Sequence, residues 1–252
     1  MEDRIRLSFV IPAHNEEAYL ARTLRAIIAE TRRSHPAAEI VVVNNASTDR
    51  TREVAESFAG VRVIDEPVKG LVRARAAGFQ AVTGALVANI DADTILPKGW
   101  TDTVLRAFAE DPDLVAISGP YIYYDVPTFT RALVRLFYGA GFVAYLLNRF
   151  VLRTGSMLQG GNFVVKREAL TKIGGFNPDF SFYGEDTDLA RRLSAVGHVR
   201  FTFGLPAFSS GRRLLGEGVV RMGIRYAMNF FWATFLKRPF THTWLDVRNH
   251  GA

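Results

Sequence analysis

The chain of 252 residues has 48% hydrophobic residues and a formal charge of +6, which is typical of one large globular domain or of a core domain with an added segment. The basic balance favours acidic partners, namely nucleic acid, an anionic membrane surface or a phosphorylated substrate. The absence of cysteine excludes disulfides and thiolate metal sites.

The sequence predicts neither a signal peptide nor a membrane-spanning helix. The N-terminal segment has no small-residue cleavage site, and no apolar run reaches about 18 residues.

The chain up to residue 90 alternates short apolar runs with helical patterns. Strands are expected at residues 6–11, 39–43, 61–65 and 85–90, and helices at 16–29, about 47–59 and 70–82. This alternation predicts a parallel sheet with right-handed crossovers. The polar loops after Ile11, Val43 and Ile90 should therefore meet at one edge of the sheet, where open α/β sheets bind ligands.

Two carboxylates follow the strand at residues 85–90. Asp91 and Asp93 are separated only by Ala92, and residues two apart in an extended chain point to the same side. Such a pair of oxygen ligands suits Mg²⁺ or Mn²⁺, which binds through one or two carboxylates together with substrate phosphates. Aspartate is also common in turns after strands, so the pair alone leaves a structural role open.

Glycine-rich nucleotide fingerprints are missing from the sequence. There is no G-x-G-x-x-G after the first strand and no G-x-x-x-x-G-K-[ST], which argues against a dinucleotide dehydrogenase and a P-loop enzyme. Phosphates would then be held by a metal, by loop amides and by basic side chains such as Lys69, Arg73 and Arg75. Each of these side chains could equally lie on a solvated face at the start of a helix.

The rest of the chain surrounds a region at 129–152 that is rich in Phe, Tyr and Leu. Before it we expect a helix at 98–110 and strands at 114–119 and 121–124; after it, a strand at 160–165, helices at 167–173 and from 184, a strand at 199–203 and a helix at 218–236. Ser209 to Arg213 is expected to form a basic loop, and the tail after Pro239 to be mobile or loosely packed.

Six segments resemble the family 2 glycosyltransferases of the GT-A fold, in family order and at family-like spacing: FVIPAHNEE, VVVNNASTDRT, KGLVRARAAGF, NIDAD, GGNFVVKREAL followed by GGF, and GEDTDLARRL. The resemblance covers about residues 7–203 and implies a Rossmann-like α/β fold, with a mostly parallel central sheet flanked by helices. It also implies a metal-dependent, inverting enzyme that takes a sugar from a nucleoside-diphosphate sugar, with Mg²⁺ or Mn²⁺ as cofactor.

The expected domain organisation follows from this match. We expect a glycosyltransferase domain at residues 1–215, with amphipathic helices inserted at about 127–155, and a C-terminal amphipathic helix and tail at 216–252.

The resemblance assigns one group of residues to the donor. The side chains implied for the nucleotide pocket are Pro12, Ala13, His14 and Glu16, and Asn45 would lie where an acidic residue often meets the base. Asn44-Asn45 replaces a loop that frequently carries aspartate, a departure that bears on base recognition. Asp91 would approach the ribose and the metal, and Asp93 would bind the metal. The further candidates for substrate contacts are Lys69, Arg73, Ala92, Gly161, Arg212 and Arg213.

The resemblance also implies that Asp186 is the general base, with Glu185 beside it. One base suffices, because inversion requires no covalent intermediate, and a metal offsets the charge on the leaving diphosphate. A helix N-terminus stabilises a carboxylate and so weakens it as a base, which implies that the proton moves late.

Residues 129–152 and 218–238 combine aromatic side chains with flanking Arg and Lys, among them Arg131, Arg135, Arg149 and Arg153. This composition suits helices in a membrane interface next to anionic lipid, or lids that pack on the core or on a second subunit. The first alternative implies a lipid-linked acceptor, such as a polyprenyl phosphate or a glycolipid, and a cytoplasmic protein at the inner face of the cell membrane. Ser210, Arg212 and Arg213 could clamp the diphosphate or an acceptor phosphate.

Other functions remain open at this point. A nucleotidyltransferase would also use metal and nucleotide, but it would want a glycine-rich, basic loop where this chain has Pro12 to Glu17. A non-catalytic nucleotide-binding scaffold would keep the fold, although the presence of Asp91, Asp93 and Asp186 argues against it. No recognised motif supports a nucleic-acid partner. A single sugar addition is favoured, because the long membrane segments of processive polymer synthases are missing.

Overall fold

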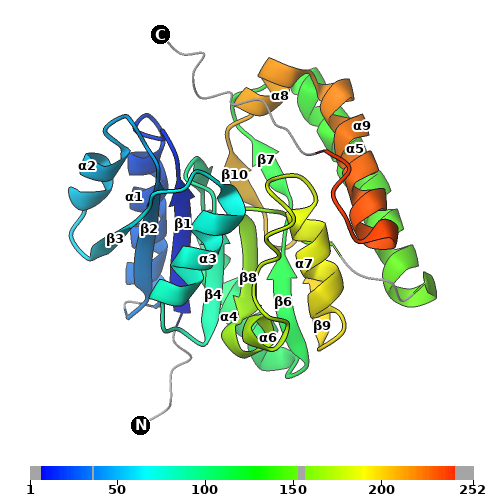
Figure 1. The fold of residues 1–252 in the computed structure, drawn as a ribbon, viewed down its shortest axis with the longest axis horizontal. Helices are drawn as coiled ribbons and strands as arrows, with labels where there is room; N and C mark the ends of the chain where they lie inside the picture. Colours follow the sequence, from blue (N-terminus) through cyan, green and yellow to red (C-terminus); the bar gives the residue numbers. More distant parts are fainter. Residues whose placement is uncertain (1–6, 36, 153–156, 242–252) are drawn as a thin grey trace.

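The computed structural model describes residues 7–35, 37–152 and 157–241. Its centre is a seven-stranded sheet in the order β3-β2-β1-β4-β8-β6-β9 (Figure 1). The strands are β1 (Leu7–Ala13), β2 (Glu39–Asn45), β3 (Val61–Glu66), β4 (Leu86–Ile90), β6 (Leu114–Ser118), β8 (Asn162–Lys166) and β9 (His198–Phe201). The mostly parallel α/β fold predicted from the sequence is confirmed.

Helices cover both faces of this sheet. Successive residues of a strand point to opposite faces, and in the central strands both sets of side chains are apolar. Phe9 and Ile11 of β1 pack with α1 (Leu20–Ser34), α2 (Thr51–Glu56) and α4 (Trp100–Glu110). Val10, between them, packs on the opposite face with α3 (Leu71–Ala81), α6 (Arg167–Lys172) and α7 (Glu185–Leu193). The predicted helices and strands are present with ends shifted by a few residues; Arg6, the predicted start of the first strand, lies outside the described residues.

Strand direction brings the predicted loops together. β1 pairs in parallel with β2 and with β4, so the loops after these strands lie at one edge of the sheet, as predicted. β8 runs antiparallel to β4 and pairs Asn162 with Ile90. The turn before β8 therefore lies beside the aspartates that follow β4.

A second, three-stranded sheet was not predicted. It consists of β5 (Thr94–Ile95), β10 (Ala207–Ser209) and β7 (Tyr121–Tyr123) in the order β5-β10-β7. Strands of two or three residues are too short to produce a periodic pattern, which explains why β5 and β10 were missed. The expectation of a basic loop from Ser209 to Arg213 is wrong, because Ser209 ends β10 and Arg212 begins the helix α8 (Arg212–Glu217).

Two helices lie side by side at one edge of the molecule (Figure 1). They are α5 (Thr128–Leu146), which continues into the π-helical turn η1 (Leu147–Leu152), and α9 (Val219–Phe231), which continues into η2 (Trp232–Leu236). A small cluster of Val134, Leu214 and Met222 joins α5, α8 and α9. Arg153 and the tail from residue 242 lie outside the described residues. In the part of the chain that the structure describes, no helix has both the length and the apolar character needed to cross a bilayer.

Candidate active site

Two adjoining pockets lie at the sheet edge where β1, β2 and β4 end. The larger is lined by Asp91, Ala92 and Asp93 after β4, by Glu185 and Asp186 at the start of α7, and by side chains of α8 and α9. The smaller is lined by residues after β1, β2 and β3. Pro12 and Leu71 line both, so the two pockets form one continuous site.

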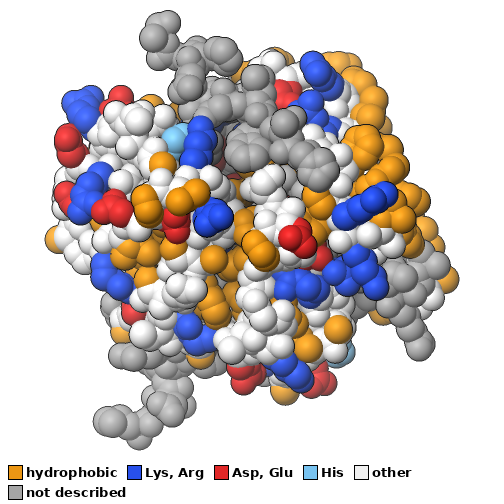
Figure 2. Space-filling view, in the orientation of Figure 1, with side chains coloured by type: hydrophobic (Ala, Val, Ile, Leu, Met, Phe, Trp, Pro, Cys, Tyr) orange, Lys and Arg blue, Asp and Glu red, His pale blue; other side chains and the backbone are white. Residues whose placement is uncertain are grey.

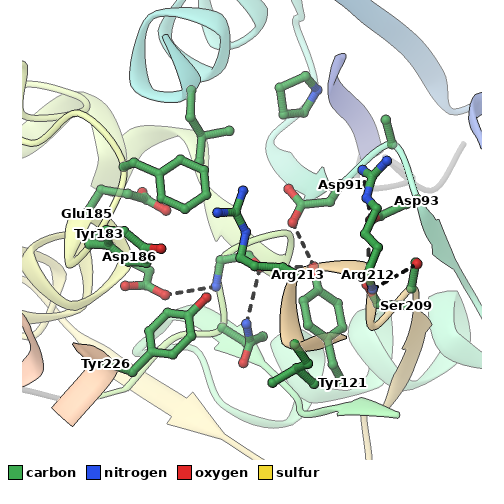
Figure 3. Close-up of a pocket in the computed structure, with 18 of the residues that line it drawn as sticks. Asp91, Asp93, Tyr121, Tyr183, Glu185, Asp186, Ser209, Arg212, Arg213 and Tyr226 are labelled. Atoms are coloured by element: carbon green, nitrogen blue, oxygen red, sulfur yellow. Dashed lines mark hydrogen bonds and ion pairs between the residues drawn. The ribbon is translucent and has the colours of Figure 1, made fainter. Parts of the chain in front are cut away.

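Asp91 is held in a fixed position by two buried side chains (Figure 3). Its Oδ2 accepts a hydrogen bond of 3.0 Å from the Tyr121 hydroxyl, and its Oδ1 lies 3.3 Å from Arg75 Nη2. Arg75 is 1% exposed and also pairs with Glu185. One buried arginine therefore joins the carboxylate after β4 to the acidic pair at the start of α7.

Gly161 allows this arrangement because it has no side chain. Its φ of +80° is in the left-handed region, and a Cβ there would lie 2.0 Å from Asp91 Cγ and 2.3 Å from the Tyr121 hydroxyl oxygen. The Asp91 N–H donates to the Gly161 carbonyl at 3.1 Å. The predicted site residue Gly161 thus packs against Asp91 without lining the pocket, whereas Gly160 lines it.

Asp93 and Glu16 both line the larger pocket, and Arg212 lies between their carboxylates. Arg212 Nη2 is 2.5 Å from Glu16 Oε1 and 3.1 Å from Asp93 Oδ2. The Ser209 hydroxyl is within 3.5 Å of Asp93 Oδ1 because β10 pairs Ser209 with Thr94.

Asp186 lies on the opposite side of the pocket from Asp91 and Asp93 (Figure 3). Its Oδ2 accepts the Gly160 N–H at 3.1 Å, and its Oδ1 accepts the Thr187 N–H at 2.8 Å. Burial raises the pKa of Asp186 above its ordinary value, although the Gly160 N–H and the charge of Arg75 oppose this. Burial likewise raises the pKa of Glu185 to about 7 against the lowering effect of Arg75.

The smaller pocket is lined by the predicted nucleotide residues Pro12, Ala13, His14, Asn45 and Lys69. The Asn45 amide group is occupied by the backbone: its Nδ2 donates to the carbonyls of Glu66 and Val68, and its Oδ1 accepts the Gly70 N–H at 2.8 Å. His14 Nδ1 lies 2.7 Å from the Asn45 carbonyl. Asn45 therefore shapes the loop that leads into α3.

Arg73, which was predicted to belong to the site, is exposed and lines neither pocket. On α3 the buried positions are Val72, Ala74, Arg75 and Gly78, so the helical period turns Arg73 outward and Arg75 inward. Every other predicted site residue lines a pocket, except Gly161, which packs behind Asp91.

The larger pocket is also lined by side chains that sequence reasoning did not single out for the site: Tyr121, Tyr123, Gln159, Phe182, Tyr183, Leu214, Met222 and Tyr226. Tyr183 packs edge-on against Tyr226 of α9 with ring centroids 5.7 Å apart. Glu217 fixes this corner, because it accepts hydrogen bonds from Arg213, Arg225 and the Tyr183 hydroxyl. The predicted domain boundary at residue 215 falls inside α8, and the aromatic content of α9 was the available signal for its part in the site.

Comparisons with known proteins agree with this geometry. A family model described as glycosyl transferase family 2 matches residues 8–174, and one described as the N-terminal domain of galactosyltransferase matches residues 151–207. The probable glycosyltransferase YdaM of Bacillus subtilis is 27% identical over 217 residues, which cover 80% of this chain and 50% of that protein. The glycosyltransferase AglE of Haloferax volcanii is 25% identical over 202 residues, covering 76% of this chain and 62% of that protein. The chain thus spans about half the length of the first of these relatives.

Two solved structures share the fold. The mannosyltransferase PcManGT of Pyrobaculum calidifontis, solved with GDP-Man and Mn²⁺, superposes with a TM-score of 0.67 at 21% identity, over 92% of this chain and 64% of that chain. Glucosyl-3-phosphoglycerate synthase of Mycobacterium tuberculosis, solved with Mn²⁺, UDP-glucose and phosphoglyceric acid, gives a TM-score of 0.60 at 21% identity, over 96% of this chain and 83% of that chain. These neighbours confirm the predicted GT-A fold. Because the first family model covers more than half of the sequence, the chain belongs to glycosyl transferase family 2.

Proposed function

We propose that this chain transfers one sugar from a nucleoside-diphosphate sugar to an acceptor hydroxyl or phosphate, with inversion at the anomeric carbon. The observation that carries the proposal is that one pocket has the carboxylates of Asp91 and Asp93 on one side and that of Asp186 on the other (Figure 3). A donor held by the first pair would present its anomeric carbon towards an acceptor next to Asp186.

The smaller pocket fits the nucleoside part of the donor. It opens at Pro12 and Leu71 into the larger pocket, so a nucleoside there could extend its diphosphate towards Asp91 and Asp93. Since the Asn45 amide is bonded to the loop at Glu66–Gly70, we assign Asn45 to shaping the pocket rather than to reading the base.

The two aspartates fit a divalent cation. In the described part of the chain no group of three or more His, Cys, Asp or Glu side chains could hold a metal, so a cation would depend on diphosphate oxygens, as Mg²⁺ commonly does. Each carboxylate has about four lone-pair sites, so the contacts of Asp91 with Tyr121 and Arg75 leave capacity for a cation. When bound, Mg²⁺ or Mn²⁺ would offset the charge that develops on the leaving diphosphate.

Asp186 is assigned as the general base. The acceptor hydroxyl gives its proton to Asp186, and its oxygen forms the new bond to the anomeric carbon as the bond to the diphosphate oxygen breaks; the electron pair leaves with the diphosphate. Burial counteracts the weakening expected from the helix start, because it raises the pKa of Asp186. Glu185 is bound by Arg75, so we assign it to holding Arg75 beside the site rather than to proton transfer.

The acceptor side favours a lipid-linked acceptor and peripheral binding at the cytoplasmic face of a membrane. Apolar side chains are exposed along the outer surface of α5, α9 and their π-helical turns, as the right-hand edge of Figure 2 shows: Phe129, Leu136, Val143, Leu147, Phe150, Val220, Ile224, Phe231 and Phe235. Exposed Arg135, Arg221, Lys237 and Arg238 lie on the same helices and at their ends, which matches anionic lipid headgroups. The inner face of α9 lines the pocket through Met222 and Tyr226. An acceptor whose head enters the pocket would therefore have its lipid tail next to the membrane-facing surface.

The experiment that tests the activity is a donor panel with product analysis. The purified chain is mixed with UDP, GDP, dTDP and CDP, with and without Mn²⁺, and its thermal unfolding is followed. A nucleotide at about 100 times its Kd should stabilise the fold by roughly 2.7 kcal/mol. The matching nucleotide sugar is then incubated with membrane lipid extract, and release of the nucleoside diphosphate is measured. Release of pyrophosphate would indicate a nucleotidyltransferase, and stabilisation without release of either product would favour the nucleotide-binding scaffold. No stabilisation by any nucleotide would contradict the proposed donor site.

A further inference from the structure

Arg212 occupies the part of the donor site where positive charge is needed. Its guanidinium bridges Glu16 Oε1 at 2.5 Å and Asp93 Oδ2 at 3.1 Å, and it packs over the Tyr19 ring at 4.6 Å. The side chain is 19% exposed. The positive charge of Arg212, on α8, is thus paired with Asp93, the carboxylate to which the proposed function assigns the metal.

The backbone that carries Arg212 is fixed. Asp125 accepts the Gly211 N–H at 2.5 Å and the Ser210 hydroxyl at 2.6 Å. Gly211 is packed so closely that a Cβ there would lie 2.1 Å from Val126 Cγ1. Any change in the partners of Arg212 must therefore come from rotation of its own long side chain.

The ion pair of Arg212 with Asp93 competes with a cation on Asp93. A guanidinium and a divalent ion at one carboxylate repel each other, and at short range in a partly buried pocket this repulsion is stronger than in water. A diphosphate removes the conflict, because its oxygens can pair bidentately with arginine. The guanidinium needs only to turn from one anion to another within the same pocket.

We propose that Arg212 couples metal binding to diphosphate binding: it pairs with Asp93 in the ligand-free site, and it releases Asp93 to the cation only when the diphosphate of the donor takes its place. This inference rests on the proposed function. Each ligand then increases the affinity for the other, and the two coupling factors are equal by linkage. The metal alone should bind weakly, because it must displace Arg212 without offering that side chain a new partner.

The test measures Mn²⁺ binding directly, by the electron paramagnetic resonance signal of free Mn²⁺, with no turnover involved. Mn²⁺ is titrated alone and then with saturating UDP, GDP, dTDP or CDP. We expect the diphosphate to tighten Mn²⁺ binding to the unaltered chain by at least about fivefold. In Arg212→Gln, Mn²⁺ alone should bind more tightly than to the unaltered chain, the diphosphate alone should bind less tightly, and the coupling factor should fall but stay above one, because the diphosphate oxygens still serve as metal ligands.

Two further variants keep the test decisive. Arg212→Lys retains the charge but cannot pair bidentately with the diphosphate, so its coupling factor should be intermediate. Arg200→Gln is the matched control, since Arg200 pairs with Asp111 at 2.8 Å and lines neither pocket; its coupling should equal that of the unaltered chain. Thermal unfolding establishes that each variant is folded, and Arg212→Lys decides the question if Arg212→Gln does not fold.

Failure of the inference differs from failure of the proposed function. If the unaltered chain binds none of UDP, GDP, dTDP and CDP with Mn²⁺, the proposed donor site is refuted along with the coupling. If it binds both ligands but Arg212→Gln or Arg212→Lys leaves the Mn²⁺ affinity unchanged or weaker, the donor site stands and the role of Arg212 is overturned.

Discussion

The donor side and the acceptor side of the pocket differ in how they are built. The donor side consists of the ends of β1, β2 and β4, where Asp91 is fixed by Tyr121, Arg75 and the close approach of Gly161. It lies within the matched family region at residues 8–174. The acceptor side is lined by α9, which lies beyond residue 207, where the family matches end, and also carries exposed apolar side chains. The helix α8, also beyond residue 207, brings Arg212 to the donor side.

This difference separates what the family shares from what belongs to this chain. Strands packed on both faces hold the donor carboxylates rigidly, and rigid placement is what a metal and a leaving group require. Amphipathic helices at the edge can vary without disturbing the sheet, so we expect them to determine the acceptor. Variants on the two sides should therefore fail in different ways.

The largest effect is expected from Asp186→Asn. Removal of a general base typically lowers turnover by about 10²–10⁴-fold. The asparagine oxygen can accept only one of the two N–H groups, of Gly160 and Thr187, that Asp186 accepts, so stability should fall somewhat while donor affinity stays close to that of the unaltered chain. Turnover and nucleoside-diphosphate binding are measured side by side, with Asp179→Asn as the exposed control. Near-full turnover of Asp186→Asn would remove Asp186 from the role of base.

Gly161→Ala should nearly abolish donor use by displacing Asp91. The new Cβ would lie 2.0 Å from Asp91 Cγ, and a shift of about 1 Å at a reacting group can lower the rate about 100-fold. Gly174→Ala is the matched control: its φ of +79° gives the same backbone strain, but nothing lies within 4 Å of its Cβ. Both variants should lose about 1–2 kcal/mol of stability, and only Gly161→Ala should lose Mn²⁺-dependent nucleotide binding. Equal activity of the two would show that Gly161 has only a conformational role.

The two sides also differ in how well they can be predicted from the sequence. The meeting of the strand ends was predicted because apolar strands, helical periods and the carboxylates after β4 are all local patterns, and parallel pairing brings the ends of β1, β2 and β4 together. The sequence motif includes both Arg73 and Arg75 and does not show which of them faces the pocket. The burial of Val72, Ala74 and Gly78 shows which face of α3 turns inward.

The parts of the pocket contributed by residues after 203 depend on long-range contacts that no local pattern encodes. The two-residue strand β5 pairs with β10, more than a hundred residues away, and this pairing places Ser209 beside Asp93. The bridge from Arg212 to Glu16 joins residues 196 positions apart. Sequence reasoning found the aromatic and basic character of α9, but not that its inner face lines the pocket.

On the acceptor side, a charge on the outer surface should weaken membrane binding without affecting the donor site. We expect the double variant Leu136→Glu, Ile224→Glu to bind vesicles containing anionic phospholipid about tenfold less tightly, because it places charge where exposed apolar side chains would enter the interface. Val68→Glu is the control, since Val68 is 50% exposed but far from α5 and α9 in the fold. Vesicle co-sedimentation at low and high salt measures the effect. Equal binding by both variants, or no binding by the unaltered chain, would favour the lid alternative for these helices.

The smallest expected effect is a pH dependence of stability and of activity that arises from Glu185. Burial raises the pKa of Glu185 from 4.5 to about 7, so between these values the folded chain binds more protons at this site than the unfolded chain. The free energy of unfolding should therefore fall as pH rises through this window, by no more than about 3 kcal/mol. Glu185→Gln removes the titrating group and should flatten this slope, which denaturant unfolding at pH 5 and pH 7 measures.

The same variant should also change the acid limb of the activity profile. Where Glu185 is ionised, towards pH 7, its charge neutralises Arg75 and repels that of Asp186. Without it the pKa of Asp186 should fall there, so an acid limb that extends to this pH range should move to lower pH. Glu168→Gln, on α6 and outside both pockets, is the control. A flattened stability slope with an unmoved acid limb would mean that Glu185 acts on the fold alone. A change in both would mean that the charge of Glu185 also acts on the base.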